Sequence, residues 1–153
     1  MRSAGLGAPV TVLVADDDAA FREALVDVLS ADERFTVVGT AASGVEVPAM
    51  CARLRPDLVL VDVRMSGGGA ELARALRAQV GHRPMLVAVS AQTGVTTVAA
   101  MLSAGARGYL AKGRLGATLP DSLARVVAGE RVLEVPGAEE ALRLVEEPLA
   151  PGS

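Results

Sequence analysis

Short apolar runs alternate with segments of helical periodicity along this chain, and this alternation restricts the fold more than any other feature. Five runs have the length of strands, and the first is as apolar as a strand buried on both faces. The runs are Val10–Ala15, Phe35–Ala41, Leu58–Val61, Met85–Val89 and Arg107–Ala111. The segments with helical patterns that follow them are Ala19–Ser30, Gly44–Leu54, Ala70–Val80, Val95–Ala104 and Leu119–Ala128. The pattern predicts an α/β fold, a five-stranded parallel sheet flanked by five helices.

Length and composition favour one domain with short extensions. The 153 residues are 51% hydrophobic, enough for one core. We expect a disordered N-terminus over residues 1–8, the domain over 9–133 and an acidic tail over 134–153 with room for one helix at Ala138–Glu146. Pro48 should delay the start of the second helix, because an interior proline costs about 3 kcal/mol.

Charge and hydropathy argue against several classes of function. The formal charge is −3 and no stripe of basic residues is present, so we expect no direct binding of nucleic acid by this chain. No apolar run approaches the roughly 20 residues that span a bilayer, so we expect no membrane insertion. Cys51 is the only cysteine and allows no internal disulfide, which fits the cytoplasm.

Polar side chains follow four of the apolar runs. Asp16 and Asp17 come directly after the first run, Asp62 after the third, Ser90 after the fourth and Lys112 after the fifth. The carboxyl ends of parallel strands meet at one edge of a sheet, so these groups should converge there. Three carboxylates, a hydroxyl and an ammonium at one edge would bind a divalent cation and a phosphoryl group.

Each of these residues also has an ordinary structural interpretation. Adjacent carboxylates such as Asp16 and Asp17 need a counter-cation, and Mg²⁺ suits them, but acids at this point also cap helices. Asp62 can act as a nucleophile toward phosphorus or serve as a turn residue. Lys112, the only lysine of the chain, would supply the ammonium that an acyl phosphate needs, or lie in a solvated loop. Ser90 would supply the hydroxyl, or serve as a turn residue.

Four segments carry a close resemblance to a known family. They are Val-Leu-Val-Ala-Asp-Asp-Asp (12–18), Arg-Pro-Asp-Leu-Val-Leu-Val-Asp-Val-Arg-Met (55–65), Ala-Val-Ser-Ala (88–91) and Ala-Gly-Ala-Arg-Gly-Tyr-Leu-Ala-Lys-Gly (104–113). Over about residues 9–133 the chain resembles the receiver domain of bacterial two-component response regulators, in particular the receivers that precede LuxR-type helix-turn-helix domains. The resemblance implies the flavodoxin-like (βα)5 receiver fold and a sensor histidine kinase as partner.

The resemblance also implies roles for single residues. Asp62 would accept the phosphoryl group, and Lys112 would contact the phosphate. Asp16, Asp17 and Asp62 would hold Mg²⁺ together with the backbone carbonyl of Arg64. Ser90 and Tyr109 would be the hydroxyl and the aromatic residue of the switch. Such a protein is not an enzyme beyond slow self-catalysed phosphotransfer and autodephosphorylation.

The chain departs from the family at Gly113, where many members have proline, and in the loop after Asp62. Ser66 stands where the family usually has proline, and three glycines follow it, so we expect a looser loop beside Asp62.

Two other functions compete with the switch. One is a receiver fold that serves only as a phosphorylation-independent dimer scaffold. The other is a small phosphohydrolase similar to the haloacid-dehalogenase group, for which Asp16–Asp18 supply an Asp-x-Asp. That group has Thr or Val where this chain has Ala20, and it has an acidic pair that is missing after Lys112.

The segment Val95–Ala104 carries no charge, which predicts a partner surface. Helical spacing places Thr97 and Met101 on its outward face. Together with the fifth strand and the fifth helix, this face is expected to bind a second copy of the chain or an effector. The alternative is that the tail of the chain covers it.

Overall fold

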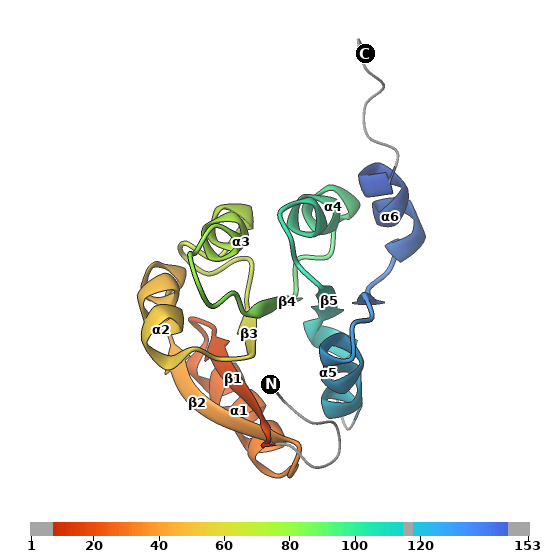
Figure 1. Cartoon of the computed structure of the whole chain (residues 1–153). Coiled ribbons are helices and arrows are strands. Elements are labelled where there is room, and N and C mark those ends of the chain that lie inside the picture. The colour runs from red at the N-terminus through yellow and green to blue at the C-terminus, as the bar shows by residue number, and fades with distance from the viewer. Residues whose placement is uncertain (1–7, 115–117, 147–153) are drawn as a thin grey trace.

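The computed structural model describes residues 8–114 and 118–146, which form one parallel sheet with helices on both faces (Figure 1). The strand order is β2-β1-β3-β4-β5-β6, and every neighbouring pair is parallel. The strands are β1 (Val10–Ala15), β2 (Phe35–Ala41), β3 (Leu58–Val61), β4 (Met85–Ser90), β5 (Gly108–Ala111) and β6 (Val132–Glu134). The helices are α1 (Ala19–Ser30), α2 (Val47–Leu54), α3 (Ala70–Arg77), α4 (Val95–Ser103), α5 (Leu119–Val127) and α6 (Ala138–Glu146). None of the helices in these two stretches has the length and apolarity to cross a bilayer.

Successive residues of each strand enter different cores because side chains alternate between the two faces of a sheet. Leu13 and Val61 belong to the core under α2, α3, α4 and α6. Val14 and Leu60 belong to the core under α1 and α5. Both faces are therefore covered, which explains why the central strand β3, Leu58–Val61, is apolar at every position.

The segment predicted as the second helix forms a short 3₁₀ turn followed by an α-helix, and the α-helix begins where a proline is tolerated. Gly44–Glu46 forms a 3₁₀ turn, η1, and α2 begins at Val47 with Pro48 in its first turn. A proline is tolerated there because the first N–H groups of a helix have no partner within the helix. The expected delay of this helix is confirmed.

The prediction of five strands and five helices is wrong, because the described residues form six of each. Val132–Glu134 pairs with β5, placing Leu133 opposite Tyr109. Three residues are too few to produce a periodic sequence signal, so this strand was not foreseen. The helix α6 occupies the residues expected for it. Residues 1–7 and 147–153, parts of the expected N-terminus and tail, lie outside the described residues, and the division at residue 133 stays a prediction.

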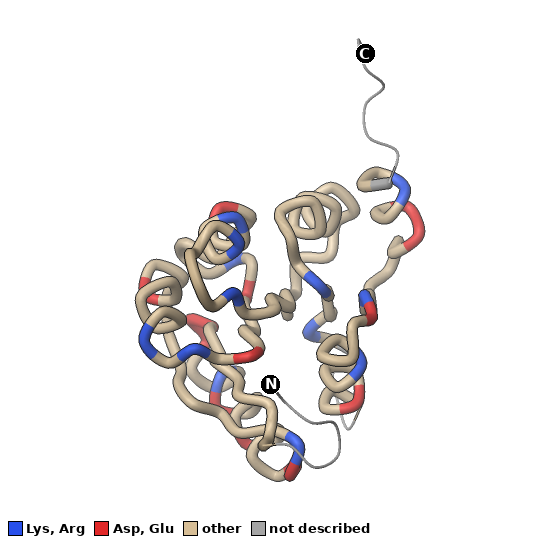
Figure 2. The backbone as a smooth tube through the Cα atoms, viewed as in Figure 1, with Lys and Arg blue, Asp and Glu red and all other residues tan. Residues whose placement is uncertain are grey.

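The helix α6 packs against α4 and covers part of its uncharged face (Figures 1 and 2). Met101, expected to point outward, is only 1% exposed, and Ala141 of α6 is 0% exposed. At the start of α6, Gly137 has φ +72°, and a Cβ there would lie 3.0 Å from Val95 Cγ2. The outward placement of Met101 is nevertheless wrong, because its side chain is buried on the flank of α4 that faces Val63 and Ala70 at the start of α3. Thr96, Ala100 and Ser103 remain exposed.

Candidate functional site

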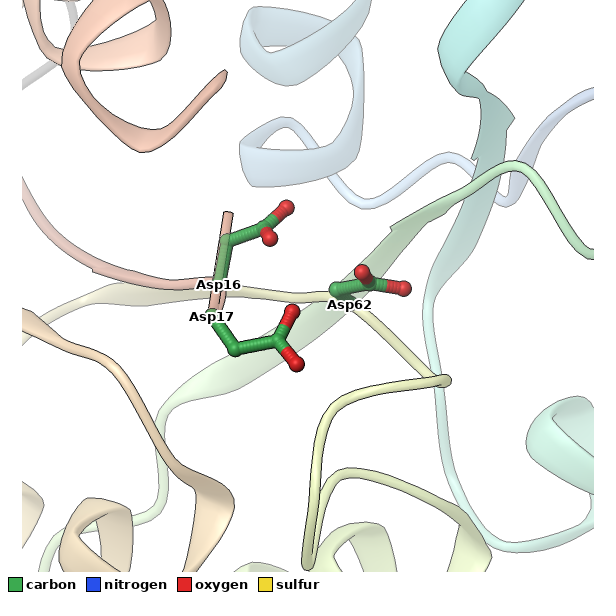
Figure 3. A group of neighbouring side chains, drawn as sticks. All are labelled: Asp16, Asp17 and Asp62. Atoms are coloured by element: carbon green, nitrogen blue, oxygen red, sulfur yellow. The ribbon is translucent and has the colours of Figure 1, made fainter. Parts of the chain in front are cut away.

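The carboxylates predicted to converge do so at the carboxyl ends of β1 and β3 (Figure 3). One oxygen from each of Asp16, Asp17 and Asp62 lies within 4.8 Å of the others. Asp16 and Asp62 are buried, with exposed fractions of 1% and 5%, whereas Asp17 is exposed. The cluster therefore has a buried floor and one side that solvent reaches.

Of the three successive aspartates after β1, the last caps α1 and the first two belong to the acidic cluster. The Asp18 carboxylate caps α1 by accepting a hydrogen bond from the Phe21 N–H at 3.1 Å. The Asp18 N–H donates to Asp16 Oδ1 at 2.8 Å, and Arg22 Nη1 donates to the Asp16 carbonyl at 2.7 Å. Because Asp18 caps the helix, Asp16 and Asp17 remain directed toward Asp62.

The Lys112 ammonium joins two of the carboxylates. Its Nζ lies 2.8 Å from Asp16 Oδ2 and 3.1 Å from Asp62 Oδ2, and 4.2 Å from the centroid of the Phe21 ring. Burial acts to lower the pKa of Lys112, but the hydrogen bonds and charges of the two carboxylates together outweigh burial and raise it. The side chain is therefore a positive charge at neutral pH.

The cluster fits a divalent cation on two observations. Three carboxylates and one ammonium leave an excess of two negative charges. Asp16 Oδ2 is buried and, among the described residues, accepts no hydrogen bond of ordinary geometry, although the Lys112 ammonium lies 2.8 Å away. Burying a carboxylate oxygen that accepts so few hydrogen bonds costs free energy of folding, and a further cation beside it would offset that cost. Oxygen ligands and a solvent-accessible side suit Mg²⁺, which keeps several waters.

Ser90 and Tyr109, the predicted switch residues, meet at the backbone of Gln92. Ser90 is 0% exposed, and its Oγ accepts a hydrogen bond from the Gln92 N–H at 3.1 Å. The buried Tyr109 hydroxyl donates to the Gln92 carbonyl. Burial raises the pKa of Tyr109, a hydrogen bond with Ser90 opposes the rise, and the charge of Asp62 adds to it. Gln92 was not foreseen, because it acts through its backbone.

The loop after β3 packs closely against its surroundings. The Arg64 N–H donates to Asp62 Oδ1 at 3.0 Å, while the role of its carbonyl as a metal ligand stays a prediction. A Cβ at Gly68 would lie 2.4 Å from the Asp62 carbonyl, and one at Gly44 would lie 2.1 Å from the Gly67 carbonyl. The glycines of this loop therefore allow a close approach of backbones, a role that the sequence did not indicate.

This fold and this site define a receiver domain, and comparison with known proteins agrees. The sequence model of the Response regulator receiver domain matches residues 12–124, so the chain belongs to that family. Its structure is similar to the signal receiver domain of the putative response regulator NarL from Mycobacterium tuberculosis. That comparison has a TM-score of 0.75 and 31% identity, over 80% of this chain and 98% of the other.

Two curated relatives illustrate the range of the family. The chain is 36% identical over 126 residues to the DNA-binding transcriptional activator DevR/DosR of Mycobacterium tuberculosis, covering 82% of this chain and 58% of that protein. It is 38% identical over 114 residues to a protein-glutamate methylesterase/protein-glutamine glutaminase of Myxococcus xanthus, covering 74% of this chain and 32% of that protein. The chain thus spans between about a third and three fifths of these relatives. Membership of the receiver family decides against the phosphohydrolase alternative.

Proposed function

We propose that this chain is a phosphorylation-controlled switch in which Asp62 accepts a phosphoryl group from a sensor histidine kinase. The observation that supports it best is the Lys112 ammonium, which contacts Asp62 while Asp16 and Asp17 complete an acidic cluster. An oxygen of Asp62 forms the new P–O bond as the P–N bond to the donor imidazole breaks. The imidazole keeps the electron pair of the broken bond and takes up a proton.

The side chains around Asp62 would each stabilise charge on the transferred group. Lys112 would bind one phosphoryl oxygen as a point charge, and the Ser90 hydroxyl would donate to another. Mg²⁺ would be held by Asp16, Asp17, Asp62 and the Arg64 carbonyl, and it would neutralise charge on the phosphoryl oxygens.

We propose that the signal leaves the site through Gln92. Recruitment of the Ser90 hydroxyl by the phosphoryl group would release the Gln92 N–H, and the carbonyl of the same residue holds Tyr109. The loop that carries Gln92 leads directly into α4, so its rearrangement would bias the position of α4. Such a switch shifts the populations of two existing states.

We place the protein in the cytoplasm, with no catalytic activity beyond slow self-catalysed phosphotransfer and autodephosphorylation. A second copy or an effector would bind through α4, β5 and α5. Because α6 packs against one flank of α4 and Met101 is buried on the other, the surface available on α4 is reduced to its exposed side around Thr96 and Ala100.

The test is the intact mass of the protein after incubation with acetyl phosphate and Mg²⁺. The wild type should gain one phosphate mass, and Asp62→Asn should gain none. Asp27→Asn, the same change at an exposed aspartate of α1, should gain it like the wild type. Equal phosphorylation of Asp62→Asn would contradict the assignment of Asp62. A wild type that takes up no phosphate would favour the phosphorylation-independent scaffold.

A further inference from the structure

The Lys112 ammonium has three neighbours of two kinds. Two are the carboxylates of Asp16 and Asp62, and the third is the face of the Phe21 ring, whose centroid lies 4.2 Å from Nζ. This distance is well within the roughly 6 Å at which a cation is attracted to an aromatic face. The ammonium is therefore bordered on one side by a group that attracts it without accepting a conventional hydrogen bond.

Both partners of this contact are held by the backbone. Phe21 lies in the first turn of α1, where its N–H donates to the capping Asp18, and its ring packs against the core under α1 and α5. Lys112 follows directly after β5, which is hydrogen-bonded to strands on both sides. The flexible part is the four-carbon stem of Lys112, which carries considerable rotamer freedom.

We infer that Phe21 is a positioning residue for phosphoryl transfer, because its ring face holds the Lys112 ammonium beside Asp62. The inference rests on the proposed function of Asp62 as phosphoacceptor. A third carboxylate in the place of the ring would add negative charge against the incoming phosphoryl group. A leucine would exclude water but would not attract the cation. The ring attracts the ammonium, adds no net charge and leaves the N–H groups free to turn toward phosphoryl oxygens.

The kinetic test compares the two phenylalanines of the chain. Phe21→Leu should lower the rate of phosphorylation by acetyl phosphate at saturating Mg²⁺ by about threefold to tenfold, the range of a partly desolvated cation–π contact. Phe21→Tyr keeps the ring face and should restore most of the rate. Phe35→Leu is the matched control, because Phe35 is buried in the same core and its ring faces Arg34, at 5.7 Å. It should leave the rate of the folded protein unchanged.

The spectroscopic test uses the fact that Lys112 is the only lysine. Protein made with lysine labelled with ¹³C at Cε gives one ε-methylene resonance, and the Phe21 ring current should move its protons upfield in the wild type. The shift should persist in Phe21→Tyr and Phe35→Leu and disappear in Phe21→Leu. If Phe21→Leu does not fold, Phe21→Met takes its place, and the wild-type shift still tests the contact.

The outcomes separate the inference from the proposed function. An ε-methylene resonance at its unperturbed position in the wild type, or an unchanged phosphorylation rate in Phe21→Leu, would overturn the positioning role while leaving Asp62 as phosphoacceptor. Equal rate losses in Phe21→Leu and Phe35→Leu would also overturn it, because the loss would then follow from the core. A wild type that takes up no phosphate would overturn the proposed function and the role of Phe21 with it.

Discussion

Lys112 lies closer to Asp16, at 2.8 Å, than to Asp62, at 3.1 Å. The lysine is thus shared between the expected phosphoacceptor and an expected cation ligand. Before phosphorylation it compensates part of the charge of both carboxylates, and a phosphoryl group on Asp62 would draw it away from Asp16. We therefore expect the lysine to link the occupancy of the cation site to the state of Asp62.

Loss of the lysine should leave two buried carboxylates without their ammonium. Lys112→Met is expected to lower the free energy of unfolding by about 2 kcal/mol, because buried charges stripped of their partner are costly. Adding Asp62→Asn should recover part of the loss, and Mg²⁺ should stabilise Lys112→Met more than the wild type. Urea denaturation with and without Mg²⁺ measures both effects. If Lys112→Met and Lys112→Met/Asp62→Asn have the same free energy of unfolding, removal of the Asp62 charge recovers nothing, and Lys112 does not compensate that charge.

Removal of the two acids after β1 should abolish cation binding. In Asp16→Asn/Asp17→Asn only one carboxylate of the cluster remains, so Mg²⁺ should neither bind measurably nor support phosphorylation. Mg²⁺ should raise the Tm of the wild type but not that of the double variant, because a ligand stabilises only the state that binds it. The chain has no tryptophan, so calorimetry or NMR should follow the binding. Unaltered Mg²⁺ affinity in the double variant would refute the site.

A charge introduced at Met101 should unfold part of the protein. Met101→Glu places an unpaired carboxylate in the core on the flank of α4 that faces Val63 and Ala70, and we expect a loss of about 3 kcal/mol or more in the free energy of unfolding. Ala100→Glu, one residue earlier on the exposed side of α4, should change it by less than about 0.5 kcal/mol. Urea denaturation of both variants distinguishes them, and similar stabilities would mean that Met101 is not buried in solution.

The thiol of Cys51 should be inert in the folded protein. Burial raises the pKa of Cys51 to about 11, so the neutral thiol is the stable form at pH 8. This preference stabilises the fold fully below the pKa of the unfolded thiol, near 9, and is lost as the pH rises from about 9 to about 11. A disulfide reagent such as DTNB should react slowly at pH 8 and rapidly in urea. Fast reaction without denaturant would show that α2 opens readily.

The sequence was sufficient to predict which residues lie at the carboxyl ends of the strands, but not which surfaces of the helices pack against other parts of the chain. Asp16, Asp62 and Lys112 could be placed together because an alternating pattern predicts parallel strands, whose carboxyl ends share one edge. A neutral helix face looks the same in sequence whether the same chain or another molecule covers it, so the burial of Met101 could not be predicted.

Two residues near the site escaped sequence reasoning for different reasons. Gln92 contributes only backbone atoms, which every residue carries. Phe21 occupies an apolar position of a helical pattern, where a residue that packs against the core and a residue that holds an ammonium have the same signature. Only the three-dimensional structure distinguishes these roles.

The folded unit extends beyond the residues that match the family model. The family match ends at residue 124, yet β6 pairs with β5 and α6 packs against α4. A chain cut after Arg131 would expose a bare sheet edge beside an apolar helix face, the combination that promotes pairing between molecules. We expect such a shortened chain to aggregate in sedimentation experiments where the longer chain forms at most a defined dimer, so that the solubility of the domain depends on residues outside the stretch that matches the family model.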